Sequence, residues 1–435
     1  MGVIGSKWTL FIGSSLFTLH LTSFLYVHFI PYYATALTLG LGFAMFYVGF
    51  GGYLTEHSSR KTIERNSTLS WTLSSVSLSI GGIMLMVTTE KPGAFDAHVS
   101  NSTSIPGVHE GKSFSDSEIR LIYAGFALVT LFSNITFLVI PRRRTSDCLE
   151  AQEEKEEKAT FGEHFQKTIT LLVDYRMIQM APVHGLCGTI SAFWMVIFPT
   201  TLTFTQRLSV NPYLPSWYSI AIGIAEVSVG LVVCIFGRRI SSFGQKPNMT
   251  IGCISFLVAL VLFLLSTPFN ATRAPSNEAS LLFESNVFTT LLIGYLLGAA
   301  DNCVNTSKGI ISALVMPEAR AQAYSIAKLH QSLFASLLMA ISPFLTVPWY
   351  CAILAVNTLL ALTMYNRTAN QIRNRELNES STSQDEGDEH KKSRIPPYFP
   401  STLPELEESG KSGMDSRRAS YASAMSQSYN HHSRE

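Results

Sequence analysis

Long apolar runs constrain the fold of this chain more than any other feature of its sequence. Ten stretches are almost free of charge, and each has the length of about 20 residues that a helix needs to cross a bilayer core. They run approximately over residues 8–29, 32–53, 70–88, 121–140, 178–204, 217–236, 249–267, 286–306, 323–346 and 348–365. Because lipid offers no hydrogen bonds to the backbone, each single crossing must be a helix. The sequence therefore predicts an all-α polytopic membrane protein of about ten spans, with the lipid bilayer as its surroundings.

Composition and charge exclude several classes of function. Charged residues make up only 14% of the chain and the net charge is +1, whereas soluble domains carry about 25% charged residues. No basic patch with interleaved aromatic residues occurs, so we expect no nucleic-acid binding. The cysteines show no CxxC pair and no Cys/His ligand spacing, which argues against a disulfide framework and a metal site. No catalytic set or phosphate-binding loop is visible, so we expect neither enzymatic activity nor a cofactor.

The distribution of basic residues predicts the orientation in the membrane. Lysine and arginine collect in the loops 55–67, 141–176, 237–248 and 307–322, and cytosolic loops carry this excess. Both termini are therefore predicted to be cytosolic. Glycosylation is then expected at Asn101 and Asn270, whose sequons fall in loops on the opposite face. The sequence does not choose between the plasma membrane and an endolysosomal membrane.

Four regions follow from this pattern. Residues 1–140 are expected to form a bundle of four spans, residues 141–176 a cytosolic linker, residues 177–366 a bundle of six spans, and residues 367–435 a disordered tail. In the linker, apolar residues recur at helical spacing at Phe161, Phe165, Ile169 and Leu172. This spacing predicts an amphipathic helix that lies on the membrane surface. In the tail, the pattern Arg417-Arg418-Ala419-Ser420 suggests phosphorylation at Ser420.

A few polar residues inside the spans are candidates for function, because a charge at the centre of a spanning helix costs roughly 2.5–3.5 kcal/mol. Glu226 lies about ten residues before Gly237, hence roughly 15 Å from the cytosolic boundary at the helical rise. Two interpretations stay open for it. It is either a protonatable group or cation site that faces a cavity, or a hydrogen-bonded glutamate that fixes helix packing.

Asp301 and Asn305 are four residues apart and therefore share one face of the eighth span. Lys328 lies at a similar depth in the next span, so we expect it to pair with Asp301 as an ion pair or gate latch, with direct contact to a substrate as the alternative. At least one of the two residues His330 and Gln331 should face the bundle interior. Three single polar residues in apolar helices are interpreted as helix–helix hydrogen bonds rather than ligand sites. They are His20, Asn134 and His184.

Several stretches resemble the Unc-ninety-three family, an ion-channel regulatory branch of the major facilitator superfamily. They are Gly52-Tyr53-Leu54-Thr55, Gly223-Ile224-Ala225-Glu226, Leu297-Gly298-Ala299-Ala300-Asp301-Asn302-Cys303-Val304-Asn305-Thr306 and Lys328-Leu329-His330-Gln331-Ser332. The basic turn around Gly237-Arg238-Arg239 resembles the cytosolic turn of the superfamily more loosely. The resemblance runs from about Lys7 to Tyr365 and is closest to the members named only for a major-facilitator domain.

The chain also departs from this family's pattern. Phe50 and Ser307 stand where family members often have glutamine. The resemblance implies twelve spans in two halves of six, and the four spans of the first half here match the last four of that half. We therefore expect the first two spans to be missing, which would leave a transport path through this chain incomplete.

The resemblance implies two functions. The first is an accessory protein that regulates an ion channel or another membrane protein, and the ten-span count favours it. The second is a secondary transporter of a small solute by alternating access, in which Glu226 is protonatable and Asp301 and Lys328 form a latch.

Overall fold

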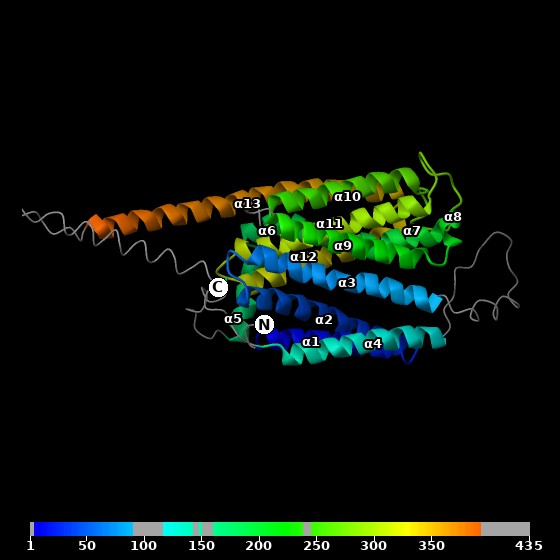
Figure 1. Ribbon diagram of the computed structural model, residues 1–435, viewed down its shortest axis with the longest axis horizontal. Coiled ribbons are helices and arrows are strands. Elements are labelled where there is room, and N and C mark those ends of the chain that lie inside the picture. Colours follow the sequence, from blue (N-terminus) through cyan, green and yellow to red (C-terminus); the bar gives the residue numbers. More distant parts are fainter. Residues whose placement is uncertain (1–3, 90–115, 142–147, 150–159, 238–244, 393–435) are drawn as a thin grey trace, which may run out of the picture. The chain divides into compact units, whose positions relative to one another are not determined.

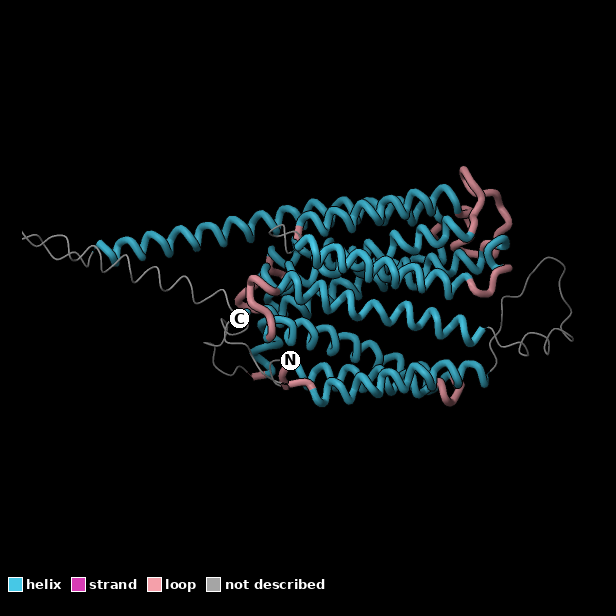
Figure 2. Tube along the Cα trace, viewed as in Figure 1, coloured by secondary structure: helices cyan, strands magenta, loops and turns pink. Residues whose placement is uncertain are grey.

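The computed structural model describes residues 4–89, 116–141, 148–149, 160–237 and 245–392. The chain divides into two compact units, residues 1–377, which contain the helical bundle, and residues 378–435. Among the described residues the fold is built from helices, with one isolated β-bridge between Thr205 and Ser276. The helices of the first unit run side by side along a common direction (Figure 2).

The first half of the bundle contains four long helices. These are α1 (Ser6–Ser23), α2 (Phe29–Glu56), α3 (Ile63–Thr89) and α4 (Asp116–Val139). Helix α1 packs against both α2 and α4 (Figure 1). A Cβ atom at Gly13 would lie 2.8 Å from the backbone nitrogen of Phe46, so only glycine lets α1 and α2 come this close.

Hydrogen bonds between spans tie this half together as predicted. Asn134 on α4 donates to Thr18 Oγ1 on α1 over 2.9 Å, and His20 Nδ1 lies 3.0 Å from Thr35 Oγ1 on α2. Both polar residues therefore serve helix–helix contacts, because a polar group in an apolar span must find a partner within the bundle.

The second half begins with a helix that is continuous from Tyr175 to Phe204 and contains one π-helical turn. Its parts are α6 (Tyr175–Ala192), the π-helix (Phe193–Ile197) and α7 (Phe198–Phe204), and they are followed by α8 (Gln206–Ser209), α9 (Leu214–Gly237), α10 (Lys246–Ser266), α11 (Val287–Val315), α12 (Arg320–Ile341) and α13 (Val347–Lys392). The rings of Phe193, Phe256 and Phe263 meet in a buried apolar core between these helices. Each predicted span thus coincides with a helix.

Eight of the described helices are long and apolar enough to cross a membrane, namely all those at the predicted spans except α1 and α12. Many large apolar side chains on the bundle remain uncovered by protein, for example Leu37 at 81% and Val139 at 74% exposed. Since only lipid would cover such a surface, the chain is a multi-pass α-helical membrane protein, as the sequence predicts.

The expected loop 307–322 is mostly helical, which corrects the prediction for Lys308. Helix α11 continues to Val315, and only four residues separate it from α12. Lys308 is therefore 7% exposed within the helix instead of lying in a cytosolic loop. The helix continues because Ile310, Ile311 and Leu314 supply another buried apolar face.

The chain after Tyr365 also departs from the prediction of a disordered tail. Helix α13 runs on to Lys392. Tyr365, Ala369 and Ile372 are almost fully buried at helical spacing, and Gln179 Nε2 on α6 donates to Thr368 Oγ1 over 2.8 Å. This buried face stabilises helix beyond the apolar run, and the sequence composition alone did not reveal it.

The predicted amphipathic helix of the linker is present as α5 (Phe161–Leu172). It begins with a capping box, in which Thr160 Oγ1 accepts from the backbone of Glu163 while the carboxylate of Glu163 accepts from the backbone of Thr160. The hydrogen bonds that the backbone and then the side chain of Thr160 give to the carboxylate hold the pKa of Glu163 below its ordinary value. Phe165 and Ile169 are 60% and 52% exposed, which suits a face that rests on lipid.

Several described basic residues lie at the end of the bundle where α2 ends and α6 begins, which we call the basic end, whereas Arg120, Arg207 and Arg273 lie toward the opposite end. Arg320 donates to the carbonyl of Leu149 over 2.5 Å, and Arg375 donates to the carbonyl of Leu314 over 2.7 Å. The expected cytosolic residues 142–144, 238 and 239, as well as Asn101 and Ser420, lie outside the described residues. Placing the basic end in the cytosol stays a prediction.

Several pairs of helices join the halves of the bundle, among them α3 with α9 and α2 with α12. Helix α3 packs along α9, where Ser219 Oγ on α9 donates to the carbonyl of Leu78 on α3 over 3.0 Å. Helix α2 packs on α12, where Tyr324 closes over Gly51. Figure 1 shows α3 lying between α9 and the group formed by α1, α2 and α4. Side chains in the middle of α2, α3, α9 and α12 can therefore meet across the two halves.

Candidate functional site

Asp301 occupies the middle of α11 and forms a network with α6 and α9. Its Oδ1 atom accepts a hydrogen bond of 3.0 Å from the indole nitrogen of Trp194, which lies in the π-helical turn after α6. The carbonyl of Trp194 in turn accepts from the Tyr218 hydroxyl of α9 over 2.8 Å. Asp301 and Trp194 are only 3% and 8% exposed, so this carboxylate is buried with a neutral donor as its partner.

Lys308 and Lys328 converge on one amide group a little nearer to the basic end. Lys308 Nζ donates to Asn305 Oδ1 and to Gln331 Oε1, each over 3.0 Å. Lys328 Nζ donates to the same Gln331 oxygen over 2.8 Å and lies 3.4 Å from the centroid of the Tyr47 ring on α2. Among the described residues, neither ammonium group forms an ion pair with a carboxylate.

The expected ion pair between Asp301 and Lys328 is therefore wrong. The residues lie on adjacent helices, but the Trp194 indole occupies Asp301 Oδ1 while Gln331 and the Tyr47 ring occupy the ammonium of Lys328. Asn305 does share a face with Asp301, because its side chain donates to the Asp301 carbonyl over 3.1 Å.

Glu226 joins the two halves of the bundle. Its Oε2 atom accepts a short hydrogen bond from Ser75 Oγ on α3, and its backbone carbonyl accepts from Asn302 Nδ2 on α11 over 3.0 Å. The side chain is 2% exposed, and its other oxygen, Oε1, has no hydrogen-bond partner in the described structure. The same holds for Asn302 Oδ1. A buried acceptor without a donor is unfavourable unless it is protonated or meets a ligand.

The two histidines of this region face each other. His184 Nδ1 on α6 lies 3.4 Å from His330 Nδ1 on α12, and the rings stack with centroids 5.7 Å apart. His184 Nε2 also lies 3.4 Å from Ser312 Oγ on α11. The interpretation of His184 as a helix–helix contact is confirmed, and both His330 and Gln331 point toward neighbouring helices.

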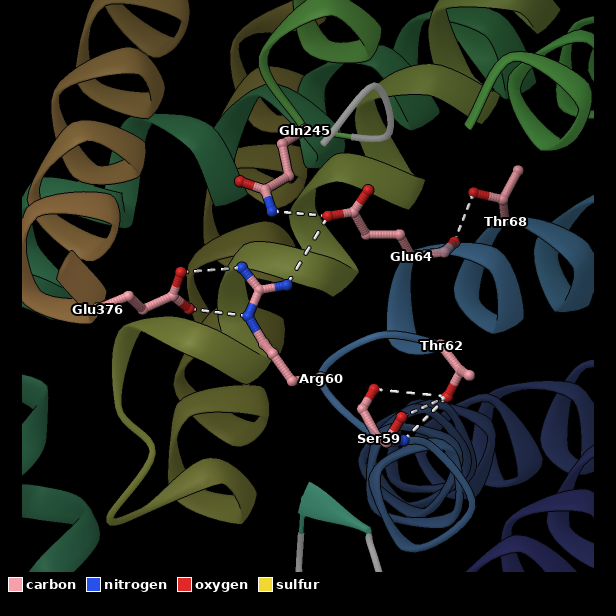
Figure 3. A network of polar contacts seen from close by, with 7 residues as sticks. All are labelled: Ser59, Arg60, Thr62, Glu64, Thr68, Gln245 and Glu376. Atoms are coloured by element: carbon pink, nitrogen blue, oxygen red, sulfur yellow. Dashed lines mark hydrogen bonds and ion pairs between the residues drawn. The ribbon is translucent and has the colours of Figure 1, made fainter. Parts of the chain in front are cut away.

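A separate network closes the basic end between the halves (Figure 3). Arg60, in the turn between α2 and α3, donates to both carboxylate oxygens of Glu376 on α13 over 2.8 and 3.2 Å. Glu64 lies 3.8 Å from Arg60 and accepts a hydrogen bond of 2.7 Å from Gln245, the residue before α10. Sequence reasoning missed this link because Glu376 lies in the region expected to be disordered.

The central site contains residues that the sequence analysis overlooked. Lys308 follows Asn305 and Asp301 at helical spacing, and the apolar residues after it were a signal that the span continues. Trp194 and Tyr47 carried no such signal, since aromatic residues are ordinary in spans. In the described part of the chain, no group of three or more His, Cys, Asp or Glu side chains could hold a metal ion.

Comparison with known families identifies the chain's relatives. A family described as ion channel regulatory protein UNC-93 matches residues 1–365. The chain belongs to the UNC-93 family. Among relatives of this family, the UNC93-like protein MFSD11 of Xenopus laevis is 21% identical over 374 residues, which cover 82% of this chain and 79% of the relative. The MFSD11 protein of Xenopus tropicalis is 21% identical over 371 residues, with the same coverage of 82% and 79%.

Solved structures show that this UNC-93 family chain has the major facilitator fold. The fucose:proton symporter FucP of E. coli superposes with a TM-score of 0.53 at 10% identity, covering 85% of each chain. The proton:xylose symporter XylE superposes with a TM-score of 0.56 at 11% identity, covering 84% of this chain and 82% of XylE. At this identity the likeness concerns the fold. It confirms the two-bundle architecture that the family resemblance implied.

Proposed function

We propose that this UNC-93 family member is a secondary transporter that moves a small solute by alternating access. The observation that carries the proposal is the set of ionisable residues on α9, α11 and α12, of which Glu226, Asp301 and Lys308 are buried, and which contacts α2 and α3 of the other half. Ionisable groups at this depth are unfavourable in lipid and serve ion or substrate pathways in known transporters. A site between two halves of one fold is where rocking of the halves exposes a solute to each side in turn.

Glu226 is the proposed proton-coupling group. Its contact with Ser75 crosses from α9 to α3, and its Oε1 atom is free to carry a proton. Protonation removes the charge of a carboxylate that is 2% exposed, and so changes the free energy of the closed interface between the halves. A proton on Glu226 would thus favour one arrangement of the halves over the other.

The network at the basic end is the proposed gate. The contact of Arg60 with Glu376 joins the turn after α2 to α13, and the contact of Glu64 with Gln245 joins the start of α3 to the residue before α10. These contacts must part for the site to open toward that end. With the basic end in the cytosol, as the basic loops predict, this arrangement closes the cytosolic side.

An accessory role is the second candidate, and the family description as an ion channel regulatory protein supports it. The sequence alone favoured this role. An accessory protein would bind an ion channel or another membrane protein through its outer helix faces and would not depend on the ionisation of Glu226. The two functions therefore differ in their response to one substitution.

The test compares Glu226→Gln with the unchanged protein in proteoliposomes that contain a trapped pH-sensitive dye. Small organic acids, sugars and amino acids are added outside, and solute-driven proton entry is recorded. We expect at least one solute to drive proton entry in the unchanged protein and a loss of at least tenfold in Glu226→Gln. Glu278→Gln, the same change at an exposed loop position, is the matched control. If solute-driven proton entry in Glu226→Gln is as fast as in the unchanged protein, Glu226 is not the proton-coupling group.

The accessory role would be favoured if no solute drives proton entry through either the unchanged protein or Glu226→Gln. Both proteins should then bind the same membrane partner to the same extent. Size-exclusion chromatography of each purified variant checks that the substitution has left the fold intact.

A further inference from the structure

Two ammonium groups in the central site share one neutral acceptor. Lys308 and Lys328 both donate to Gln331 Oε1, over 3.0 and 2.8 Å. Two like charges this close repel each other, and burial strengthens the repulsion because the surroundings screen it poorly. Among the described residues no carboxylate lies within ion-pair distance of either group. When both lysines are protonated, the site holds positive charge that no contacting carboxylate among the described residues balances.

The nearby acids do not neutralise these lysines by contact. Asp301 attracts both ammonium groups through space, but its Oδ1 atom accepts from Trp194. Glu226 accepts from Ser75 on the side of α9 that faces α3. His184 and His330 face each other, and each has its own neighbours. Among the described residues, none of these groups accepts a hydrogen bond from the ammonium of Lys308 or Lys328.

Donors remain free at this point, whereas acceptors do not. Each ammonium has three N–H groups, and Lys308 uses two of them, on Asn305 and Gln331. Lys328 uses one on Gln331 and directs its charge at the Tyr47 ring. The amide nitrogen of Gln331 donates to no described residue, and its oxygen already accepts twice. A ligand that satisfies this site must accept hydrogen bonds and carry negative charge.

The site is also reachable. Lys308 is nearly buried, but Lys328, Gln331 and Tyr47 are each only partly covered by protein. Tyr47 belongs to α2 and the other residues to α11 and α12, so the site lies where the two halves meet.

Resting on the proposed transport function, we propose that the transported solute is a small organic or inorganic anion whose carboxylate or phosphate-like group binds between Lys308 and Lys328. One negative charge there accepts a charge-assisted hydrogen bond from each ammonium and removes their repulsion. The Gln331 amide supplies a third donor. A cationic solute would be repelled by the same groups, and a neutral sugar would leave the repulsion in place.

The experiment measures thermal unfolding of the full-length purified protein at constant ionic strength. The probes are sodium lactate, sodium succinate, sodium phosphate and sodium sulfate, with lactamide and succinamide as uncharged counterparts. We expect at least one anion to raise the melting temperature saturably, whereas lactamide and succinamide have no effect. The carboxylates and the inorganic anions are tested separately, so comparing their half-saturating concentrations shows which anionic group the site prefers.

Substitutions of the two lysines test whether the stabilising anion binds at this site. Lys308→Met and Lys328→Met should each raise the half-saturating concentration at least tenfold, and Lys328→Arg, which keeps the charge, should retain most of the binding. Lys61→Met, at an exposed lysine of the basic end, is the matched control and should bind like the unchanged protein. The proposal is overturned if no probe stabilises saturably, or if both Met variants keep the original half-saturation.

The anion-binding test and the transport test can fail separately. Anion binding without flux in proteoliposomes would support the anion site and contradict the transport function. Flux of an uncharged solute that is the same in Lys328→Met would support the transport function and contradict the anion site.

Discussion

Lys308 on α11 and Lys328 on α12 donate to the same oxygen, Gln331 Oε1, over 3.0 and 2.8 Å. The two lysines are twenty positions apart in the sequence, and the short turn between α11 and α12 brings them together. The consequence is a concentration of positive charge where lipid surrounds the bundle. This relationship leads to the first prediction.

Gln331→Glu places a carboxylate between the two ammonium groups with almost no change in shape. We expect a more stable fold, because two hydrogen bonds gain charge assistance and each such bond is worth about 1.5–3 kcal/mol. We also expect saturable stabilisation by anions to be lost, since the new carboxylate takes their place. Melting curves with and without the anion probes check both effects. A variant that still binds anions like the unchanged protein would contradict the prediction.

Trp194→Phe should destabilise the second half of the bundle. It removes the indole donor of Asp301 Oδ1 and leaves a carboxylate oxygen without its partner in a site that is 3% exposed. An unsatisfied buried acceptor costs about 1–3 kcal/mol. Thermal unfolding of purified protein measures the loss. Trp217→Phe, at a tryptophan that is 43% exposed, is the control and should change stability little.

Gly188→Ala should disturb the site without touching any of its polar side chains. A Cβ atom at Gly188 would lie 2.1 Å from the backbone carbonyl oxygen of Gln331, so α6 and α12 must move apart. We expect lower thermal stability and at least a tenfold weaker response to the anion probes. Gly40→Ala provides the control, because nothing lies within 4 Å of the Cβ position there. Equal behaviour of the two variants would show that the close helix approach is not required.

Arg60 and Glu376 should couple weakly but measurably across the halves. Their side chains are 38% and 40% exposed, so solvent screens the ion pair and its contribution is about 1 kcal/mol or less. A double-mutant cycle with Arg60→Ala and Glu376→Ala measures the coupling from unfolding free energies. The coupling should shrink as salt concentration rises. Additive effects of the two substitutions would argue against the gate contact.

Asp174, at the start of α6, should contribute acid-sensitive stability. The Arg176 guanidinium donates to its carboxylate over 3.2 and 3.3 Å and holds the pKa of Asp174 below its ordinary value. Because the folded pKa is depressed, this stability is fully present above the unfolded pKa and is lost as pH falls through the folded pKa. Asp174→Ala removes the helix cap, which is worth about 1 kcal/mol. Its melting temperature should therefore depend less on pH in the acid range than that of the unchanged protein.

The position of Lys308 shows where sequence reasoning reached its limit. The positive-inside rule predicts that a lysine after a polar stretch lies in a cytosolic loop. Only the packing of Ile310, Ile311 and Leu314 against neighbouring helices keeps this stretch helical and buried. The expected partner of Lys328 failed for a related reason. The depth of Asp301 was misjudged because α11 continues to Val315, so Lys308, and not Asp301, lies level with Lys328. The rotation of each helix then decides which side chains face each other.

The sequence by itself determined that the chain is a multi-pass helical membrane protein, and it located each helix to within a few residues for most ends. It also identified the UNC-93 family and most residues of the central site. These properties depend on apolar length and short-range spacing, which a single segment carries in its own residues. The tertiary structure alone decided that Trp194 binds Asp301, that Ser75 binds Glu226 and that two lysines share Gln331. Such contacts join segments far apart in the chain, and they exist only once helix packing has fixed which faces meet.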